Sequence, residues 1–280
     1  MRRDIRAMLA GKIPEDKIPL VVRSFDVIGS KGKAVAIIEV PDEVSEYKSE
    51  IGEALMRVQS NVKSVLLKAS ERTGEYRTRE MVVIAGDPDT EVIHKESGCR
   101  FKLDPKTVYF SPRESHERER IVEDVNPGEN ILVMFSGIAP IPICITRFHK
   151  DVTCTAVELN PYAHEYAVEN VRLNKVGDRV TPLLGDVREV CKDMPPFDRV
   201  YMPLPKGAYQ FLDTATTLVK DGGVLGLYHW APGDDLWSEA EKVLHEAFSK
   251  EERSIEVIHR VKVSQYNPKY WKVRVDAQVQ

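Results

Sequence analysis

From residue 131 to the C-terminus, strand-like runs alternate with helix-like segments, and this alternation constrains the fold more than any other feature of the chain. The strand-like runs are short, apolar and rich in β-branched residues: 131–135, 152–158, 180–184, 200–202 and 223–229. The helix-like segments between and after them are 141–148, 163–174, 210–219 and 236–248. Such alternation predicts a parallel sheet with helices on both faces, so the expected class is α/β with a Rossmann-like domain.

Two further strand-like runs, 254–263 and 271–278, close the chain with no helix between them. Consecutive strands without a crossover pair antiparallel, so they predict an antiparallel edge on the parallel sheet. We therefore assign 104–280 to the Rossmann-like domain. Residues 18–103 read as a small α+β domain with a helix over 43–59 and a hairpin around Gly98, and residues 1–17 read as a helical leader.

Composition narrows the functional classes. No apolar run approaches the roughly 18 residues of a transmembrane helix, and no apolar segment follows the basic N-terminus, so a cytoplasmic protein is predicted. The four cysteines form no CxxC pair and the seven histidines no HExxH cluster, which predicts no metal site. The net charge of −4 gives no overall basic footprint for nucleic acid, although residues 63–79 and 113–120 are locally basic.

The ends of successive predicted strands carry residues suited to a nucleoside-containing cofactor. The first strand runs into Phe135, Ser136 and Gly137, a turn in which the backbone can approach a ligand. Glu158 ends the second strand 21 residues after Gly137, close to the ~20 typical of an acid that binds ribose hydroxyls. Asp186 follows the third strand, where an acid can accept from an adenine amino group.

These features fit S-adenosylmethionine better than NAD, because the turn lacks the repeated glycines of a pyrophosphate site. The cofactor-binding prediction extends to Asn160, which follows Glu158, and to Pro203, which follows the fourth strand in a rigid Pro-Leu-Pro turn. The alternative for Glu158 and Asp186 is that they only cap the following helices. The alternative for the segment around Pro203 is a plain loop.

Several segments together resemble one family, the archaeal and eukaryotic enzymes that N1-methylate guanosine 37 of tRNA, with the related aminocarboxypropyl transferases of wybutosine synthesis. The resemblance runs in family order over most of the chain. The matching segments are Gly74–Glu80, Val108–Arg113, His116–Arg120, Met134–Gly137, Glu158–Pro161, Leu173–Val176, Gly185–Arg188 and Leu204–Lys206.

The resemblance implies roles for individual residues. Glu117 would be the general base that takes the N1 proton of guanine, and Arg77 would hold the base through its O6. Arg118 and Tyr109 would line the cofactor or base pocket. Glu117 suits the role chemically, because guanine N1 carries a proton at neutral pH and a carboxylate can remove it. The alternative is that Glu117 and Arg118 are the charged face of a helix that starts near Ser115.

Three positions depart from the family pattern: Val133 replaces an aspartate, Ala139 a glycine, and Pro203 an asparagine. An asparagine amide could bond the target base and a proline cannot, so Pro203 weakens the prediction of methyl transfer without weakening that of the cofactor domain. The chain also starts directly at the domain that is the middle one in full-length family methyltransferases.

Methyl transfer to guanosine 37 is our prediction, with the anticodon stem-loop of tRNA as partner and a monomer as the oligomeric state. Aminocarboxypropyl transfer to a tricyclic guanosine derivative is the enzymatic alternative. An inactive tRNA-binding protein and a small-molecule methyltransferase are the others.

Overall fold

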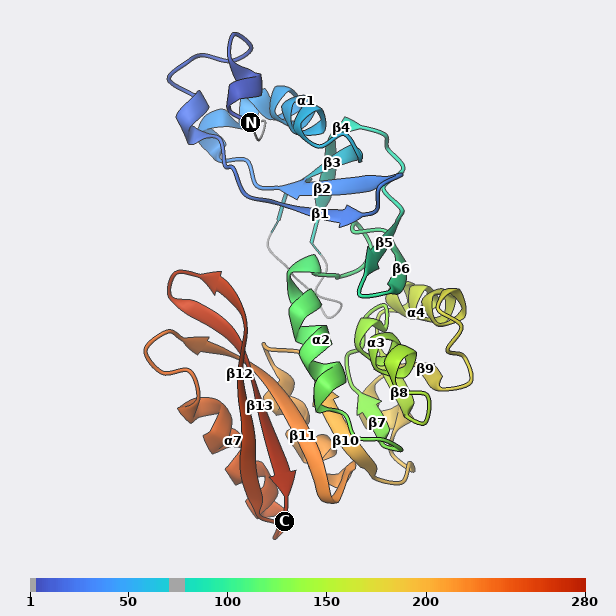
Figure 1. Ribbon diagram of the computed structural model, residues 1–280. Coiled ribbons are helices and arrows are strands. Elements are labelled where there is room, and N and C mark those ends of the chain that lie inside the picture. The colour runs from blue at the N-terminus through green and yellow to red at the C-terminus, as the bar shows by residue number, and fades with distance from the viewer. Residues whose placement is uncertain (1–3, 71–78) are drawn as a thin grey trace. The chain divides into compact units, whose positions relative to one another are not determined.

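The computed structural model describes residues 4–70 and 79–280, and the chain divides into two compact units between Pro112 and Arg113 (Figure 1). The predicted start of the Rossmann-like domain, residue 104, lies a few residues before this division. Each unit has its own sheet and its own core.

The first unit is built on a four-stranded sheet of order β1-β2-β3-β4, in which β2 and β3 are parallel and the other pairs antiparallel. Its strands are β1 Phe25–Gly29, β2 Ala34–Ile38, β3 Val62–Lys68 and β4 Met81–Gly86. Helix α1, Lys48–Val58, packs on β3 and β4 after a 3-10 turn at Asp42–Tyr47. Over residues 4–17, the described part of the predicted helical leader, the chain forms only a 3-10 turn, Ala7–Leu9. Its apolar side chains enter this core.

A hairpin of β5, Val92–Glu96, and β6, Cys99–Leu103, completes the first unit. Gly98 lies in its turn with φ +74°, a conformation that glycine adopts without steric cost. The hairpin predicted around Gly98 is confirmed.

The second unit contains a seven-stranded sheet of order β12-β13-β11-β10-β7-β8-β9. Its strands are β7 Asn130–Val133, β8 Thr153–Glu158, β9 Val180–Leu184, β10 Phe197–Met202, β11 Val219–Pro232, β12 Ile255–Asn267 and β13 Tyr270–Val279. Its helices are α2 Ser115–Asp124, α3 Pro140–Phe148, α4 Pro161–Leu173, α5 Val187–Val190, α6 Leu212–Thr217 and α7 Ser238–Lys250. The five strands β7 to β11 are parallel, and β12 and β13 form the predicted antiparallel edge.

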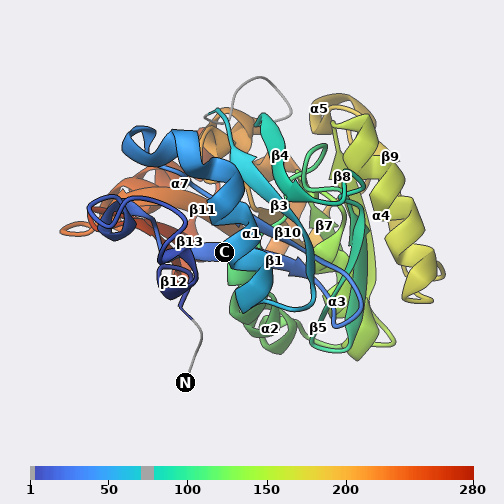
Figure 2. The ribbon, with the colours of Figure 1, turned by 90° about the horizontal axis from the view of Figure 1, so that it is seen from above.

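The order of strands places a topological switch point between β7 and β10, where successive connections run in opposite directions along the sheet. Ligands of open α/β sheets bind beyond the carboxyl ends of the strands at such a point. Pro140 and Pro161 are the first residues of α3 and α4, a position where the backbone N–H that proline lacks would have no partner within the helix. Helix α4 packs against β8 and β9 (Figure 2). The Rossmann-like α/β prediction is confirmed.

The fold differs from the predictions mainly around β11. The helix expected over 210–219 ends at Thr217, and β11 begins at Val219 rather than 223. Gly226 lets β11 pass closely over its neighbours, since a Cβ there would lie 2.7 Å from the Tyr201 ring and 2.8 Å from Asp276 Oδ1. None of the described helices combines the length and apolarity needed to cross a membrane.

Candidate cofactor site and buried ion network

The turn after β7 is held at the switch point by backbone hydrogen bonds to both neighbouring strands. Met134 N donates to Tyr201 O at 2.9 Å, and Ser136 N donates to Val157 O at 2.8 Å. Gly137 has φ +57°, and the turn also holds Phe135 and Ala139 at φ +54° and +61°. A left-handed non-glycine residue costs about 1–2 kcal/mol, so two of them in one turn mark a backbone fixed by its surroundings.

Glu158 closes this turn from the end of β8. Its Oε2 accepts from Gly137 N at 2.7 Å, and its Oε1 accepts from Asn160 N at 2.8 Å. Burial raises the pKa of Glu158, although backbone N–H groups of Asn160, Gly137 and Leu159 oppose the shift. A carboxylate can accept about four hydrogen bonds, so hydroxyl donors of a ribose would add to these backbone donors and favour its ionised form.

Asn160 and Ser136 complete this part of the edge. Asn160 is buried, and its Oδ1 caps α4 by accepting from Tyr162 N at 3.0 Å. The Ser136 hydroxyl is buried and has no hydrogen-bond partner among residues 4–70 and 79–280. An orphaned hydroxyl beside a carboxylate with spare acceptors fits a hydroxyl-rich ligand such as the nucleoside part of S-adenosylmethionine.

Asp186 lies after β9 and is both a helix cap and half of an ion pair. Its Oδ1 accepts from Arg188 N at 2.9 Å at the start of α5. The Arg188 guanidinium donates to both carboxylate oxygens. Arg188 therefore lowers the pKa of Asp186. The capping alternative considered from the sequence is realised, and the adenine role of Asp186 stays a prediction.

Phe135, a predicted cofactor residue, forms an aromatic pair with Phe211, which the sequence did not single out as a site residue. The rings of Phe135 and Phe211 meet edge to face at 4.8 Å between centroids. The guanidinium carbon of Arg188 lies 4.9 Å from the Phe211 ring centroid. Strand spacing could not find Phe211, because it is in a 3-10 turn after the Pro203 segment, well away from the predicted strand ends.

Pro203 follows β10 directly and is half-buried at the switch point. Leu204 N donates back to Met202 O at 2.8 Å, so the segment is a tight turn. Its role toward the cofactor stays a prediction.

Glu117 and Arg118 lie in the first turn of α2 and are both buried, with 2% and 4% exposure. The helix starts at Ser115 as expected, but these two side chains are not a solvated face. Glu117 Oε1 accepts from the Tyr228 hydroxyl at 2.7 Å and from Arg274 Nη1 at 2.8 Å. Its Oε2 accepts only from Arg120, at 3.1 and 2.8 Å, among the described residues.

Arg274, on β13, joins Glu117 to two more carboxylates. It is 1% exposed and pairs with Asp124 and with Asp276 as well as with Glu117. The sequence analysis named none of Tyr228, Arg274, Asp124 or Asp276. We call Glu117, Arg120, Asp124, Tyr228, Arg274 and Asp276 the buried ion network.

Two predicted site residues are not placed by this geometry. Tyr109 belongs to the first unit and is 39% exposed. Arg77 lies outside the described residues.

A seven-stranded, mostly parallel sheet with an acid that closes a strand-end glycine turn is typical of Rossmann-like transferases that use S-adenosylmethionine. Comparison with known proteins agrees. The model of the TRM5/TYW2 methyltransferase domain matches residues 92–258, and that of the TYW2 N-terminal domain matches residues 5–90. The chain belongs to the TRM5/TYW2 methyltransferase family.

Relatives from both branches of this family are similar to the chain. The tRNA (guanine(37)-N(1))-methyltransferase Trm5b of Pyrococcus abyssi is 39% identical over 267 residues, which cover 95% of this chain and 78% of the relative. Its crystal structure superposes with a TM-score of 0.85. The tRNA(Phe) (4-demethylwyosine(37)-C(7)) aminocarboxypropyltransferase of Methanocaldococcus jannaschii is 36% identical, over 86% of this chain and 94% of the relative.

A solved structure also bears on the cofactor. M. jannaschii TYW2 in complex with AdoMet is 26% identical, with a TM-score of 0.71, and covers 92% of this chain and 99% of the other. S-adenosylmethionine, predicted from the strand-end residues, is the cofactor of this family.

Proposed function

We propose that this protein transfers the methyl group of S-adenosylmethionine to N1 of guanosine 37 in tRNA. The observation that carries the proposal is the 39% identity, over 95% of this chain, to a Trm5b that is named for this reaction. S-adenosylmethionine supplies an electrophilic methyl group on a positively charged sulfur. The cofactor would be held by the backbone of the Phe135–Gly137 turn, the Glu158 carboxylate and the region of Asp186.

Glu117 is the proposed proton acceptor, and the asymmetry of its carboxylate supports that role. Oε1 is fixed by two fully buried donors, whereas Oε2 is held by Arg120, whose side chain is 39% exposed. Arg120 is the most exposed of the three donors to Glu117, so an entering base would displace its guanidinium more readily than the two buried donors. Oε2 would then accept the N1 proton, leaving Tyr228 and Arg274 to orient the group.

A second candidate reaction is transfer of the aminocarboxypropyl group to a tricyclic guanosine-37 derivative. It is favoured by the match of residues 5–90 to the TYW2 N-terminal domain and by Pro203, which offers no donor to a target base. Both reactions use the same cofactor and differ in which carbon attached to sulfur is attacked.

Isotope transfer distinguishes the two reactions. Purified protein is incubated with tRNA transcripts and with S-adenosylmethionine labelled either in its methyl group or in its carboxyl group. Methyl label in unmodified tRNA supports the proposal, and carboxyl label in a tricyclic-precursor tRNA supports the second candidate. Label in neither substrate contradicts both.

The role of Glu117 is tested by Glu117→Gln beside Arg120→Ala. Glu117→Gln is expected to lower turnover by about 10²–10⁴-fold with little change in cofactor affinity. Arg120→Ala leaves Oε1 fixed and should retain most of the turnover. Equal loss of cofactor affinity and turnover in Glu117→Gln would assign Glu117 to structure instead.

The proposal includes a monomeric protein in the cytoplasm. Light scattering of the purified chain and fractionation of cells that express it would check these two points. A stable dimer, or recovery with membranes, would contradict them.

A further inference from the structure

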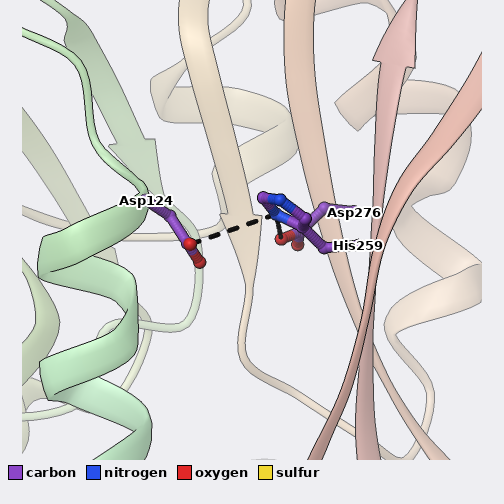
Figure 3. A group of neighbouring side chains, drawn as sticks. All are labelled: Asp124, His259 and Asp276. Atoms are coloured by element: carbon purple, nitrogen blue, oxygen red, sulfur yellow. Dashed lines mark ion pairs between the residues drawn. The ribbon is translucent and has the colours of Figure 1, made fainter.

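Three side chains far apart in the sequence, two of them members of the buried ion network, lie close together. Asp124 is the last residue of α2, His259 lies on β12 and Asp276 lies on β13 (Figure 3). His259 Nδ1 is 3.4 Å from Asp276 Oδ2 and 4.0 Å from Asp124 Oδ1. One ligand atom from each of the three residues lies within 4.8 Å of the other two.

The two carboxylates share one arrangement. Asp124 pairs through Oδ2 with Arg274, and Asp276 places Oδ1 3.0 Å from Arg274 Nε. In each carboxylate, one oxygen therefore pairs with Arg274 and the other points toward His259 (Figure 3). Arg274 thereby fixes the orientation of both carboxylates. Residues behind the ligands of known metal sites orient them in the same way.

Asp276 is a buried carboxylate with incomplete hydrogen bonding. It is 0% exposed, and within residues 4–70 and 79–280 neither of its oxygens accepts a hydrogen bond of acceptable geometry. A buried carboxylate in that state costs free energy unless a cation or donors complete its surroundings. Burial accordingly raises the pKa of Asp276, although Arg274 opposes the shift.

The charges of the neighbourhood point the same way. Three guanidinium groups, those of Arg120, Arg199 and Arg274, face four carboxylates. The carboxylates are Glu117, Asp124, Glu129 and Asp276. With all four carboxylates ionised and His259 neutral, the group carries one net negative charge. The raised pKa of Asp276 reflects the cost of that ionised state, which a bound cation would offset.

We propose that Asp124, His259 and Asp276 bind a divalent transition-metal cation such as Zn²⁺. One imidazole nitrogen and two carboxylate oxygens are a ligand set that such ions accept. Ligand atoms about 2.1 Å from a tetrahedral Zn²⁺ lie about 3.4 Å apart, so small side-chain movements close the triad. His259 is half exposed, which gives the ion a path from solvent and leaves a position for water.

The bound cation would fasten the C-terminal end of α2 to the β12–β13 edge. Helix α2 carries Glu117, so the ion would act as a structural clamp on the helix that holds the proposed base. Residue spacing predicted no metal site, because positions 124, 259 and 276 come together only through the antiparallel edge of the sheet.

The test uses the full chain, freed of metal by a chelator and dialysed, without tRNA or S-adenosylmethionine. Calorimetric titration with ZnCl₂ should show one ion per chain, and Mn²⁺ should lose its free-ion electron paramagnetic resonance signal on binding. His259→Ala should weaken binding about tenfold or more. His245→Ala, which removes an exposed histidine on α7, is the matched control and should bind as wild type.

Circular dichroism checks that the variants are folded, and His259→Gln provides a second variant of similar size. Saturable binding that is lost in both His259 variants supports the site. No one-to-one binding to wild type, or equal binding by the His259 variants, overturns it. Since the assay needs no transfer reaction, its failure is separate from a failure of the proposed function.

Discussion

Replacing Glu158 by glutamine is expected to weaken S-adenosylmethionine binding by about ten- to a hundredfold. The carboxylate accepts from Gly137 N and Asn160 N at 2.7 and 2.8 Å, and in the proposed complex it would also accept from a ribose hydroxyl. A hydrogen bond to a charged group contributes about 1.5–3 kcal/mol. Loss of one such bond multiplies the dissociation constant roughly tenfold for every 1.4 kcal/mol.

The substitution also disturbs the turn itself. Glutamine offers one oxygen and one NH₂ group, so it can accept from only one of the two backbone N–H groups in the present geometry. The N–H group left unpaired costs about 1–3 kcal/mol, and the free energy of unfolding should fall by a similar amount.

Calorimetric titration with S-adenosylmethionine measures the affinity, and urea unfolding measures the stability. Glu165→Gln, which changes an exposed glutamate on α4, is the matched control and should alter neither. If folded Glu158→Gln binds the cofactor as tightly as wild type, the ribose role of Glu158 is refuted.

Three further predictions concern the pH dependence of cofactor binding, the buried ion network and the close packing of β11. Burial raises the pKa of Glu158, and ribose hydroxyls favour its ionised form, so cofactor affinity should fall as the pH drops through a range above that of an ordinary glutamate. Titrations of Glu158→Gln should lack this pH dependence. Arg274→Met removes the partner of three carboxylates and should lower the free energy of unfolding by about 3–5 kcal/mol. Arg188→Met breaks a more exposed pair and should lower it by no more than about 1 kcal/mol. Equal losses of the two variants in urea unfolding would contradict this prediction. Gly226→Ala places a methyl group against Tyr201 and should destabilise by about 1–3 kcal/mol, and an unchanged melting temperature would contradict the close approach.

The Rossmann-like core could be predicted because its signals are local. Short apolar runs, helical periodicity and the glycine turn identified β7, β8 and β9, and Glu158 indeed meets Gly137 across the turn. Parallel strands end at the same edge, so residues at successive strand ends come together whatever the details of packing.

The buried ion network could not be predicted because its signals are not local. Residues 271–277 alternate apolar and charged side chains, which is the pattern of a strand with one solvated face. In the structure that charged face is covered, since Arg274 meets Glu117 and Asp124 from α2. Each element alone looks amphipathic and exposed, and only the tertiary pairing shows that the two polar faces bury each other.

The central claim is methyl transfer to N1 of guanosine 37, and nucleoside mass spectrometry tests it most directly. Unmodified tRNA transcript is incubated with the protein and S-adenosylmethionine, digested, and compared with a transcript that carries adenosine at position 37. We expect N1-methylguanosine from the first transcript and none from the second. A guanosine transcript that remains unmodified, while a tricyclic-precursor tRNA gains an aminocarboxypropyl group, would contradict the claim and move this chain to the aminocarboxypropyl branch.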